Sequence, residues 1–195
     1  MKKINAYTLI ELMIIIAIIG ILLAIVTPNL RSYISNSSSN SLSNTLLIDI
    51  MFTRNHAISK KKIVKMIPTG VADSGISIFS PNSAGVNWAQ GWTIFEDDND
   101  NDLMDNGEQL IRFHGSFGPG AHVSSGPLDS LLDANNPIGF NAQGAAYGQG
   151  AKTGRGILRI ATFGCAGLNA RTIQINQIGQ IVGRDIQCPL AFTVL

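Results

Sequence analysis

A long apolar run near the N-terminus constrains what this chain can fold into more than any other feature. It spans Leu9–Val26 and reads LIELMIIIAIIGILLAIV. At 1.5 Å per residue, a helix over this run is about 27 Å long, close to the hydrocarbon thickness of a bilayer. Lys2 and Lys3 precede the run and predict a cytoplasmic N-terminus. No small-x-small cleavage site follows it, so we expect the run to remain in the processed chain.

Glu11 is the one charged residue within this run. A carboxylate at membrane depth is costly, and a partner or a function usually accounts for it. Two explanations stay open on the residues alone. The carboxylate either lies high enough in the bilayer to reach water, or it pairs with a cation supplied by another chain.

The residues that flank this glutamate resemble a known processing signal. Lys2-Lys3-Ile4-Asn5-Ala6 followed by Tyr7-Thr8-Leu9-Ile10-Glu11-Leu12 is similar to the class III signal of type IV pilins and type II secretion pseudopilins. The resemblance implies cleavage after Ala6 by a prepilin peptidase and N-methylation of the new terminus at Tyr7. It also implies that Glu11 meets the terminal amine of a neighbouring subunit. Ala6 stands where the family usually has Gly, and Tyr7 where it usually has Phe.

The same resemblance implies a location and a set of partners. Residues 7–28 form the membrane and filament-core part of the helix, and the head lies in the periplasm before assembly. The expected partners are other pilin or pseudopilin subunits, the prepilin peptidase and the inner membrane. Pili and type II secretion systems share every feature used so far, so the choice between them stays open.

Beyond the apolar run, the sequence predicts a continuing helix. Leu42, Leu46 and Ile50 recur every four residues, as in an amphipathic helical stripe. The run Ser35–Asn44 (SNSSSNSLSN) is poor in helix formers and predicts a weak section of that helix. Lys60-Lys61-Lys62 fits a helix C-terminus, where cations suit the macrodipole. The chain therefore divides into a leader (1–6), a long helix (7–62) and a head (63–195).

The head shows short β-type runs separated by Ser, Gly, Asn and Pro clusters, which favours an antiparallel β-rich domain. The expected strands are Ile63–Ile67, Ile76–Phe79, Trp92–Phe95, Leu110–Phe113, Ile138–Phe140, Ile157–Ile160, Thr172–Asn176 and Phe192–Val194. The glycine-rich stretch 139–156 predicts a surface loop. The predicted fold class is thus α+β, with a long N-terminal pilin helix packed on an antiparallel β-rich globular head.

The layout of the head narrows the resemblance. Gly91-Trp92 enters a strand, an acidic loop ends in Gly107-Glu108, and two cysteines come late in the chain. This order resembles the FimT/GspH branch of minor pilins and minor pseudopilins. The resemblance implies a structural subunit that supports filament assembly or priming.

Composition excludes several other classes. Charged residues make up 14% of the 195 residues, against roughly 25% in a typical soluble domain. A net charge of +1 provides no global field that attracts nucleic acid or an anionic membrane. Cys165 and Cys188 belong to no C-x-x-C pair, so we expect a structural disulfide in an oxidising compartment. The three histidines belong to no nucleophile–base pattern, which argues against an enzyme.

The acidic loop Asp97–Glu108 has two possible functions. Counted from Asp97, its oxygen side chains fall at positions 1, 3, 5, 9 and 12 of an EF-hand-like loop. The candidate calcium ligands are Asp97, Asn99, Asn101, Asp105 and Glu108. Asp102 occupies the sixth position, where such loops require Gly. A solvated hairpin loop is the alternative, and both remain open.

DNA binding is the alternative function. Some FimT-like minor pilins bind DNA through a C-terminal Gly-Arg-x-Arg motif, and the matching segments here, at Gly179 and at Gly183, lack a complete copy of it. The remaining candidates for a patch that contacts phosphates are four arginines of the head. They are Arg155, Arg159, Arg171 and Arg184.

Overall fold

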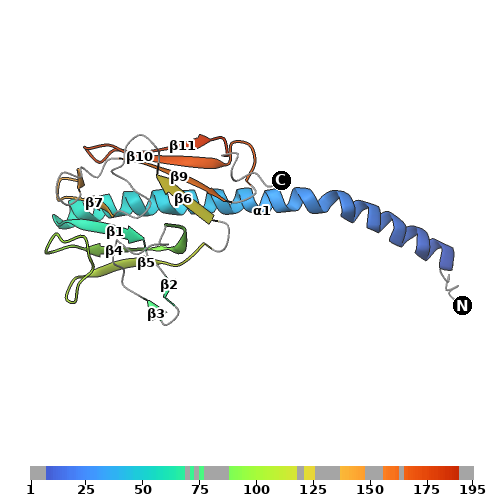
Figure 1. The fold of residues 1–195 in the computed structure, drawn as a ribbon, viewed down its shortest axis with the longest axis horizontal. Helices are drawn as coiled ribbons and strands as arrows, with labels where there is room; N and C mark the ends of the chain where they lie inside the picture. Colours follow the sequence, from blue (N-terminus) through green and yellow to red (C-terminus); the bar gives the residue numbers. More distant parts are fainter. Residues whose placement is uncertain are drawn as a thin grey trace, which may run out of the picture.

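The strands of the head are arranged around one long N-terminal helix (Figure 1). A computed structural model describes residues 8–68, 71–72, 75–76, 88–117, 121–125, 137–147, 156–162 and 165–188, without the side chains of 24–32, 71–72, 75–76, 122, 124 and 125. The helix α1 spans Leu9–Lys60, a length of 52 residues. It ends at Lys61, which adopts the left-handed conformation with φ 57° and donates its backbone N–H to the carbonyl of Ala57. Ala6 and Tyr7, the predicted processing residues, lie outside the described part of the chain.

Two antiparallel sheets pack on α1, from different sides in Figure 1. The first sheet has the strand order β5-β4-β1-β7-β8 and the second β11-β10-β9-β6. Strands of the first sheet are β1 (Val64–Pro68), β4 (Trp92–Glu96), β5 (Leu110–His114), β7 (Ile138–Phe140) and β8 (Ala146–Tyr147). Strands of the second are β6 (Ala121–Ser125), β9 (Gly156–Thr162), β10 (Ala170–Ile175) and β11 (Ile181–Ile186). A short hairpin, β2 (Val71–Ala72) and β3 (Gly75–Ile76), and a 3-10 turn η1 (Trp88–Gln90) complete the described elements.

The hydrophobic core lies between α1 and the inner faces of these sheets. Leu42, Leu46 and Ile50 supply the helix side, as their spacing predicts, and all three are fully buried. They contact buried side chains of both sheets and of η1, chiefly Trp88, Trp92, Met66, Ile94, Phe140, Leu158, Ile160 and Ile173. The predicted α+β class is therefore confirmed, with an N-terminal helix packed on antiparallel sheets.

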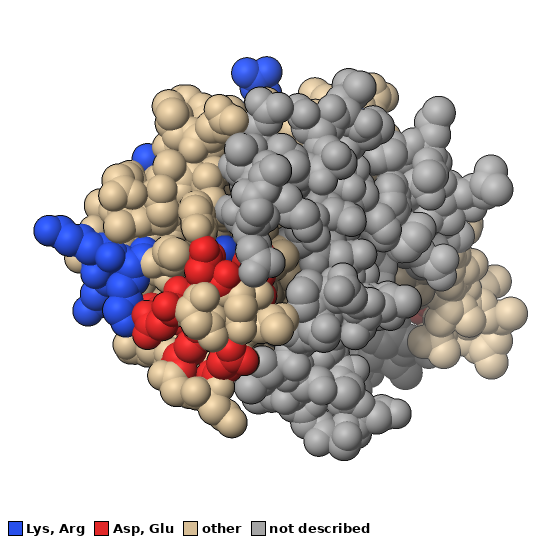
Figure 2. Space-filling model, turned by 60° about the vertical axis from the view of Figure 1, so that its left-hand side comes forward, with Lys and Arg blue, Asp and Glu red and all other residues tan. Residues whose placement is uncertain are grey.

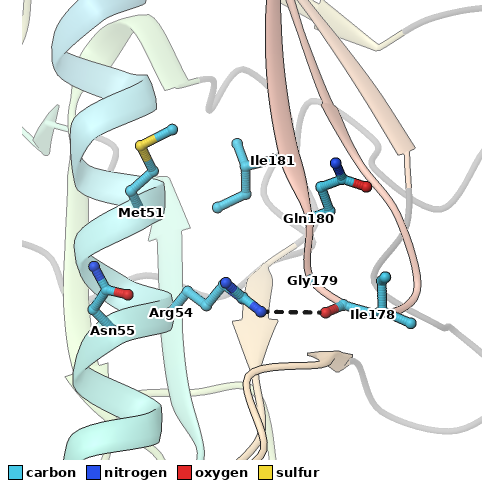
Figure 3. A pocket seen from close by; sticks show the side chains of 7 residues that line it. All are labelled: Met51, Arg54, Asn55, Ile178, Gly179, Gln180 and Ile181. Atoms are coloured by element: carbon cyan, nitrogen blue, oxygen red, sulfur yellow. Dashed lines mark hydrogen bonds between the residues drawn. The ribbon is translucent and has the colours of Figure 1, made fainter.

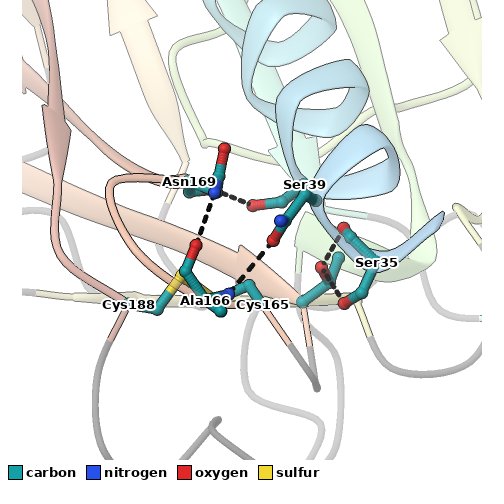
Figure 4. Close-up of a disulfide and its surroundings, with 8 residues drawn as sticks. Ser35, Ser39, Cys165, Ala166, Asn169 and Cys188 are labelled. Atoms are coloured by element: carbon teal, nitrogen blue, oxygen red, sulfur yellow. Dashed lines mark hydrogen bonds between the residues drawn. A yellow bond between two sulfur atoms is a disulfide. The ribbon is translucent and has the colours of Figure 1, made fainter. Parts of the chain in front are cut away.

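The serine-rich section of α1 is helical throughout, and contacts with the head explain why. Ser39 donates its hydroxyl to the carbonyl of Asn169 over 2.7 Å, and the side-chain oxygen of Asn36 accepts from the backbone N–H of Ala166 over 3.1 Å. The hydroxyl of Thr162 donates to the carbonyl of Ser35 over 2.6 Å. Figure 4 shows these bonds beside the disulfide. Tertiary hydrogen bonds thus offset the low helix propensity of the run.

Most predicted strands agree with the structure to within two residues at either end. The prediction of a loop over 139–156 is wrong at Ala146–Tyr147, which forms β8, whereas residues 141–145 form a tight turn that joins it to β7. In that turn Gly144 donates its N–H to the carbonyl of Asn141 over 2.8 Å. The sequence does not predict strands β2, β6, β8 and β11. The expected strand Phe192–Val194, and most of Ile76–Phe79, lie outside the described residues.

The described helix does not meet the usual requirements of a membrane span. Among the residues that the structure describes, none of the helical segments combines the length and the apolar character needed to cross a bilayer.

Cys165 and Cys188 form the expected disulfide, with their Cα atoms 6.0 Å apart. The bond closes the end of the second sheet, where both sulfurs pack on Ala161, Ala170 and Ile186. It also holds the segment that carries Ala166 and Asn169, the two residues that hydrogen-bond to α1 (Figure 4). The disulfide therefore fixes the contact between the C-terminal part of the head and the serine-rich section of the helix.

We expect the double variant Cys165→Ser/Cys188→Ser to lower the free energy of unfolding by about 3 kcal/mol, the chain-entropy value for a loop of this size. Denaturant unfolding of the full chain in detergent, with and without reductant, measures the loss. Leu168→Ala is the matched control, since Leu168 is exposed in the same segment. Equal stability of the double variant and the control would contradict a role for the disulfide in holding this contact.

Candidate functional site

The start of α1 is closed by a capping box that involves the predicted assembly residue. Thr8 is the N-cap, and its side chain accepts from the backbone N–H of Glu11 over 3.3 Å. In return, the backbone N–H and the hydroxyl of Thr8 both donate to Oε2 of Glu11, over 2.8 and 3.0 Å. Such reciprocal bonds satisfy donors that a helix start leaves open. Oε1 of Glu11 accepts none of the bonds within this cap, and the side chain is exposed.

The helix beyond this cap carries an exposed apolar surface. Every large apolar side chain from Leu9 to Leu23 is about half exposed or more. Contiguous apolar surfaces of this size mark sites that contact a membrane or other proteins. The exposed residues are Leu9, Ile10, Leu12, Met13, Ile14, Ile15, Ile16, Ile18, Ile19, Ile21, Leu22 and Leu23.

A buried carboxylate orients α1 against the first sheet. Asp49 is only 2% exposed, accepts from the indole N–H of Trp92 over 2.8 Å, and forms an ion pair with Arg112. The guanidinium of Arg112 also lies over the ring of Phe52, 4.0 Å from its centroid. Sequence reasoning missed this group, although a lone Asp between the core positions Leu46 and Ile50 was a usable signal. A buried charge with partners on two strands fixes the rotation of the helix.

Side chains of the acidic loop form hydrogen bonds to the loop's own backbone and to one another. The two oxygens of Asp97 accept from the backbone N–H groups of Asn101 and Asp102, over 3.2 and 3.1 Å. The side-chain amides of Asn99 and Asn101 both donate to Oδ2 of Asp105 over 2.7 Å. The carboxylate of Glu108 accepts from the N–H groups of Asp98 and Asp105, over 3.1 and 2.9 Å. The structure thus brings Asn99, Asn101 and Asp105 together, whereas Asp97 and Glu108 bond to backbone N–H groups. Among the described residues, the acidic side chains whose oxygens lie within 4.8 Å of one another are instead Asp97, Asp100 and Asp102.

Lys65 of β1 lies inside this loop, although nothing in the sequence singled it out. Its side chain is 0% exposed, and its ammonium contacts Asp102 directly, with Asp100 at 3.4 Å and Asp97 at 3.8 Å. The ring of Tyr147 lies 5.0 Å from the same ammonium, and its hydroxyl donates to Asp100 over 2.6 Å. Figure 2 shows acidic side chains gathered on one face, with basic side chains directly beside them. An internal cation therefore neutralises part of the negative charge of the loop.

The turn that the EF-hand-like motif requires is present even without glycine. Asp100 and Asp102 adopt the left-handed conformation, with φ of 55° and 62°. Asp tolerates this region better than most residues, at a cost that surrounding contacts must offset. The contacts of both carboxylates with Lys65 supply that compensation.

Four ionisable groups of this region have shifted pKa values, and the hydrogen bond to Glu96 raises the pKa of the Lys62 ammonium. The hydrogen bond from Lys62 lowers the pKa of the Glu96 carboxyl, with a smaller contribution from His56, against the effect of burial. Burial raises the pKa of the Asp97 carboxyl. The hydrogen bond to Asp100 raises the pKa of the Tyr147 hydroxyl, which therefore stays protonated as a donor.

The four candidate DNA-binding arginines do not form one group. Arg159 and Arg184 are exposed and lie opposite the same residue, Thr172, on the two strands that flank β10. Arg171 is on the other face of the sheet, because side chains alternate along a strand. There it pairs with Asp185 over 2.9 Å and contacts the side chain of Asn44. Arg155 lies outside the described residues.

The chain matches two family descriptions that agree with this arrangement. Residues 1–27 match the prokaryotic N-terminal methylation motif, which places the chain in the class of type IV pilin-like proteins. Residues 42–179, more than half of the chain, match the family of type II transport protein GspH, and the chain belongs to this family. The predicted resemblance to a minor pilin or pseudopilin is therefore confirmed. Membership implies association with other pilins and processing by prepilin peptidase.

Among solved structures, the chain is similar to the type IV minor pilin FimU of Pseudomonas aeruginosa strain PAO1. The crystal form in space group P65 shares 16% identity at a TM-score of 0.48, covering 74% of this chain and 90% of that one. The form in space group P21 shares 15% identity at a TM-score of 0.46, covering 78% and 89%. A search of curated proteins finds no match.

We expect the stability contributed by Glu96 to be lost at acidic pH. Its folded pKa is depressed, so the contribution is present above the ordinary value of 4.5 and disappears as pH falls through the folded value. The difference in unfolding free energy between the wild type and Glu96→Gln should therefore shrink from pH 6 toward about pH 3. Thermal unfolding across this pH range measures it. A difference that stays constant would contradict the ion pair with Lys62 as its source.

Proposed function

We propose that this chain is a structural subunit of a type IV pilus or a type II secretion pseudopilus, where it supports filament assembly or priming. Before assembly it resides in the inner membrane as a single-pass protein with its head in the periplasm. The observation that carries the proposal is the exposed apolar N-terminal segment of α1, Leu9–Leu23, which continues without a break into the part of the helix that packs on the head. Lipid covers this surface first, and neighbouring helices cover it in the filament.

The capping box supports a specific assembly contact. Thr8 holds Oε2 of Glu11, so the carboxylate has a fixed orientation and keeps Oε1 for a second partner. We propose that this partner is the methylated amine at Tyr7 of an adjacent subunit, released when prepilin peptidase cleaves after Ala6. A buried ion pair need not add net stability, because desolvation opposes the attraction. Its contribution is register, since a misaligned subunit leaves a carboxylate unpaired in an apolar bundle.

We expect Glu11→Ala to abolish entry of the full chain into sheared filaments, and Thr8→Val to reduce it, because the second variant frees the carboxylate without removing it. Quantitative immunoblots of filament and membrane fractions measure the distribution. Mass spectrometry of the wild-type chain should show an N-terminus at methylated Tyr7. Leu110→Ala is the control, since Leu110 is exposed on β5 of the head. Equal incorporation of all three variants would show that assembly does not need Glu11.

A calcium ion bound by the acidic loop is a further proposal, supported by the convergence of Asn99, Asn101 and Asp105. An ion that binds only the folded chain adds roughly 2.7 kcal/mol at a hundredfold excess over Kd. We therefore expect calcium to raise the thermal midpoint relative to chelator, and Asn99→Ala/Asp105→Ala to remove this difference. Identical midpoints in calcium and chelator would contradict a calcium site in this loop.

DNA uptake remains the second candidate function, and one observation favours it. Arg159 and Arg184 are exposed on either side of Thr172, and no described acidic side chain pairs with either of them. Two guanidiniums on one sheet face suit contacts with phosphates. Arg171, which is paired on the opposite face, is excluded from this patch.

We expect Arg159→Ala/Arg184→Ala to weaken any binding of duplex DNA by the full chain. The slope of log K against log salt should become shallower by roughly 2, at about 0.9 per phosphate contact. Gel-shift titrations at several salt concentrations measure both quantities. Lys60→Ala is the control, because Lys60 is an exposed cation at the end of α1. If binding by the wild type did not depend on salt, DNA binding through phosphates would be contradicted, and the structural function would be the remaining candidate.

A further inference from the structure

The ammonium of Lys65 is enclosed by carboxylates and does not reach solvent. Lys65 lies on β1, the middle strand of the first sheet, and its side chain is 0% exposed. Lysine is almost never fully buried unless its charge is paired. Here the ammonium contacts Oδ1 of Asp102 directly, and Oδ2 of Asp97, whose side chain is also 0% exposed, lies 3.8 Å away. An amine, a carboxylate and a second carboxylate therefore meet inside the protein.

The first sheet is shaped to let the lysine side chain reach this position. Gly139 of β7 lies opposite Lys65, and Tyr147 of β8 lies opposite Gly139, so the three residues form one row across the strands. A Cβ at position 139 would lie 2.6 Å from Cδ of Lys65 and 2.6 Å from the carbonyl oxygen of Tyr147. Glycine at 139 thus leaves space for the lysine side chain to cross the neighbouring strand.

The hairpin of β7 and β8, which covers the lysine, is held in place at both ends. The hydroxyl of Tyr147 donates to Asp100 of the acidic loop over 2.6 Å. At the turn, Nε of Arg54 donates to the carbonyl of Gly144 over 2.8 Å, and a terminal nitrogen of the same guanidinium donates to the carbonyl of Ile178 over 3.5 Å (Figure 3). The amine and the carboxylates are therefore kept in fixed positions by the surrounding fold.

We propose that Lys65 and Asp102 become joined by an isopeptide bond, an amide between Nζ of the lysine and Cγ of the aspartate. The ion pair in the structure is the reactant of this modification. Ammonium and carboxylate together contain all the atoms of the amide and of one water molecule, so the reaction needs no oxidant, reductant or activating group. The inference concerns the folding of a single chain and does not rest on the proposed function.

The proton transfers can be assigned to groups that the structure places at the pair. One proton passes from Nζ to the carboxylate of Asp102, which gives a neutral amine and a carboxylic acid. The lone pair of Nζ then attacks Cγ and forms the C–N bond. Asp97 takes the second proton from Nζ and delivers it to a hydroxyl on Cγ. The C–O bond breaks, its electron pair leaves with the oxygen as water, and Asp97 returns to its starting state.

Burial and alignment favour this condensation. A buried ion pair carries a desolvation cost that a neutral amide does not. Reactants held in alignment behave as if present at an effective concentration of about 10⁵–10⁸ M. Asp97 is itself fixed, because its oxygens accept from the backbone N–H groups of Asn101 and Asp102. The side chain of Asp102 is 15% exposed, so the released water has a way out.

Tryptic digestion of the denatured full chain, followed by mass spectrometry, tests the bond. The sequence has no Lys or Arg from Met66 to Ile111, so an unmodified chain gives the separate peptides 63–65 and 66–112. An amide on Lys65 blocks cleavage at that residue. The expected product is one peptide, 63–112, that is lighter than its sequence by one water molecule, with fragment ions that join residues 65 and 102. Recovery of peptides 63–65 and 66–112, or of 63–112 at its full mass, would overturn the proposal.

Three variants test the assignment of the residues. Asp102→Ala should abolish the linked peptide. Asp97→Asn should lower the linked fraction by about tenfold or more, because a positioned acid–base group typically contributes 10²–10⁴-fold. Asp98→Ala is the matched control, since Asp98 is an exposed acid of the same loop that pairs with Lys62, and it should leave the linked fraction unchanged.

The digest of the wild type decides whether the bond exists even if a variant fails to fold. A linked peptide that persists in Asp102→Ala would overturn the choice of Asp102. An unchanged linked fraction in Asp97→Asn would overturn the proton transfer by Asp97.

Discussion

Burial of one face of α1 by two sheets is the constraint on which the rest of the structure depends. Leu42, Leu46 and Ile50 form a single stripe, and buried side chains of both sheets belong to the same core. The bonds from Trp92 and Arg112 to Asp49 then set the rotation of the helix about its axis. Because that rotation decides which side chains remain outside, the packing of the head also determines the surface available to other subunits.

Buried charges make this packing specific. Lys65 and Asp49 each take partners from different elements, and removing one partner of such a group leaves a charge without compensation, at a cost of about 3–5 kcal/mol. A slipped strand or a rotated helix would have the same effect. The ammonium of Lys65 thereby ties the acidic loop to β1, while Tyr147 ties it to β8. The loop is part of the fold and not a loose connection between two strands.

The sequence predicts the helix and the regular strands well, because both depend on local periodicity. The four-residue spacing of Leu42 and Leu46 and the apolar run of β4 are visible without any tertiary information. Strand β11 was missed because Gly183-Arg184-Asp185 breaks the apolar pattern, and its pairing with β10 supplies the missing stability. Lys65 was missed because a lysine in a strand normally faces water. The acidic loop and Tyr147, both more than thirty residues later in the chain, contact its ammonium in the folded structure.

The composition of α1 reflects two environments that one helix must meet. Glu and Lys would raise the helix propensity of the section Ser35–Asn44, where each Ser costs about 0.5 kcal/mol relative to Ala. They would also place charges on the face that stays outside the head. Serine and asparagine keep that face soluble and neutral, and bonds from Ser39 and Asn36 to the disulfide-linked segment offset the loss of propensity. Contacts with the head therefore keep this section helical. Its neutral surface also costs less free energy to desolvate than a charged surface would.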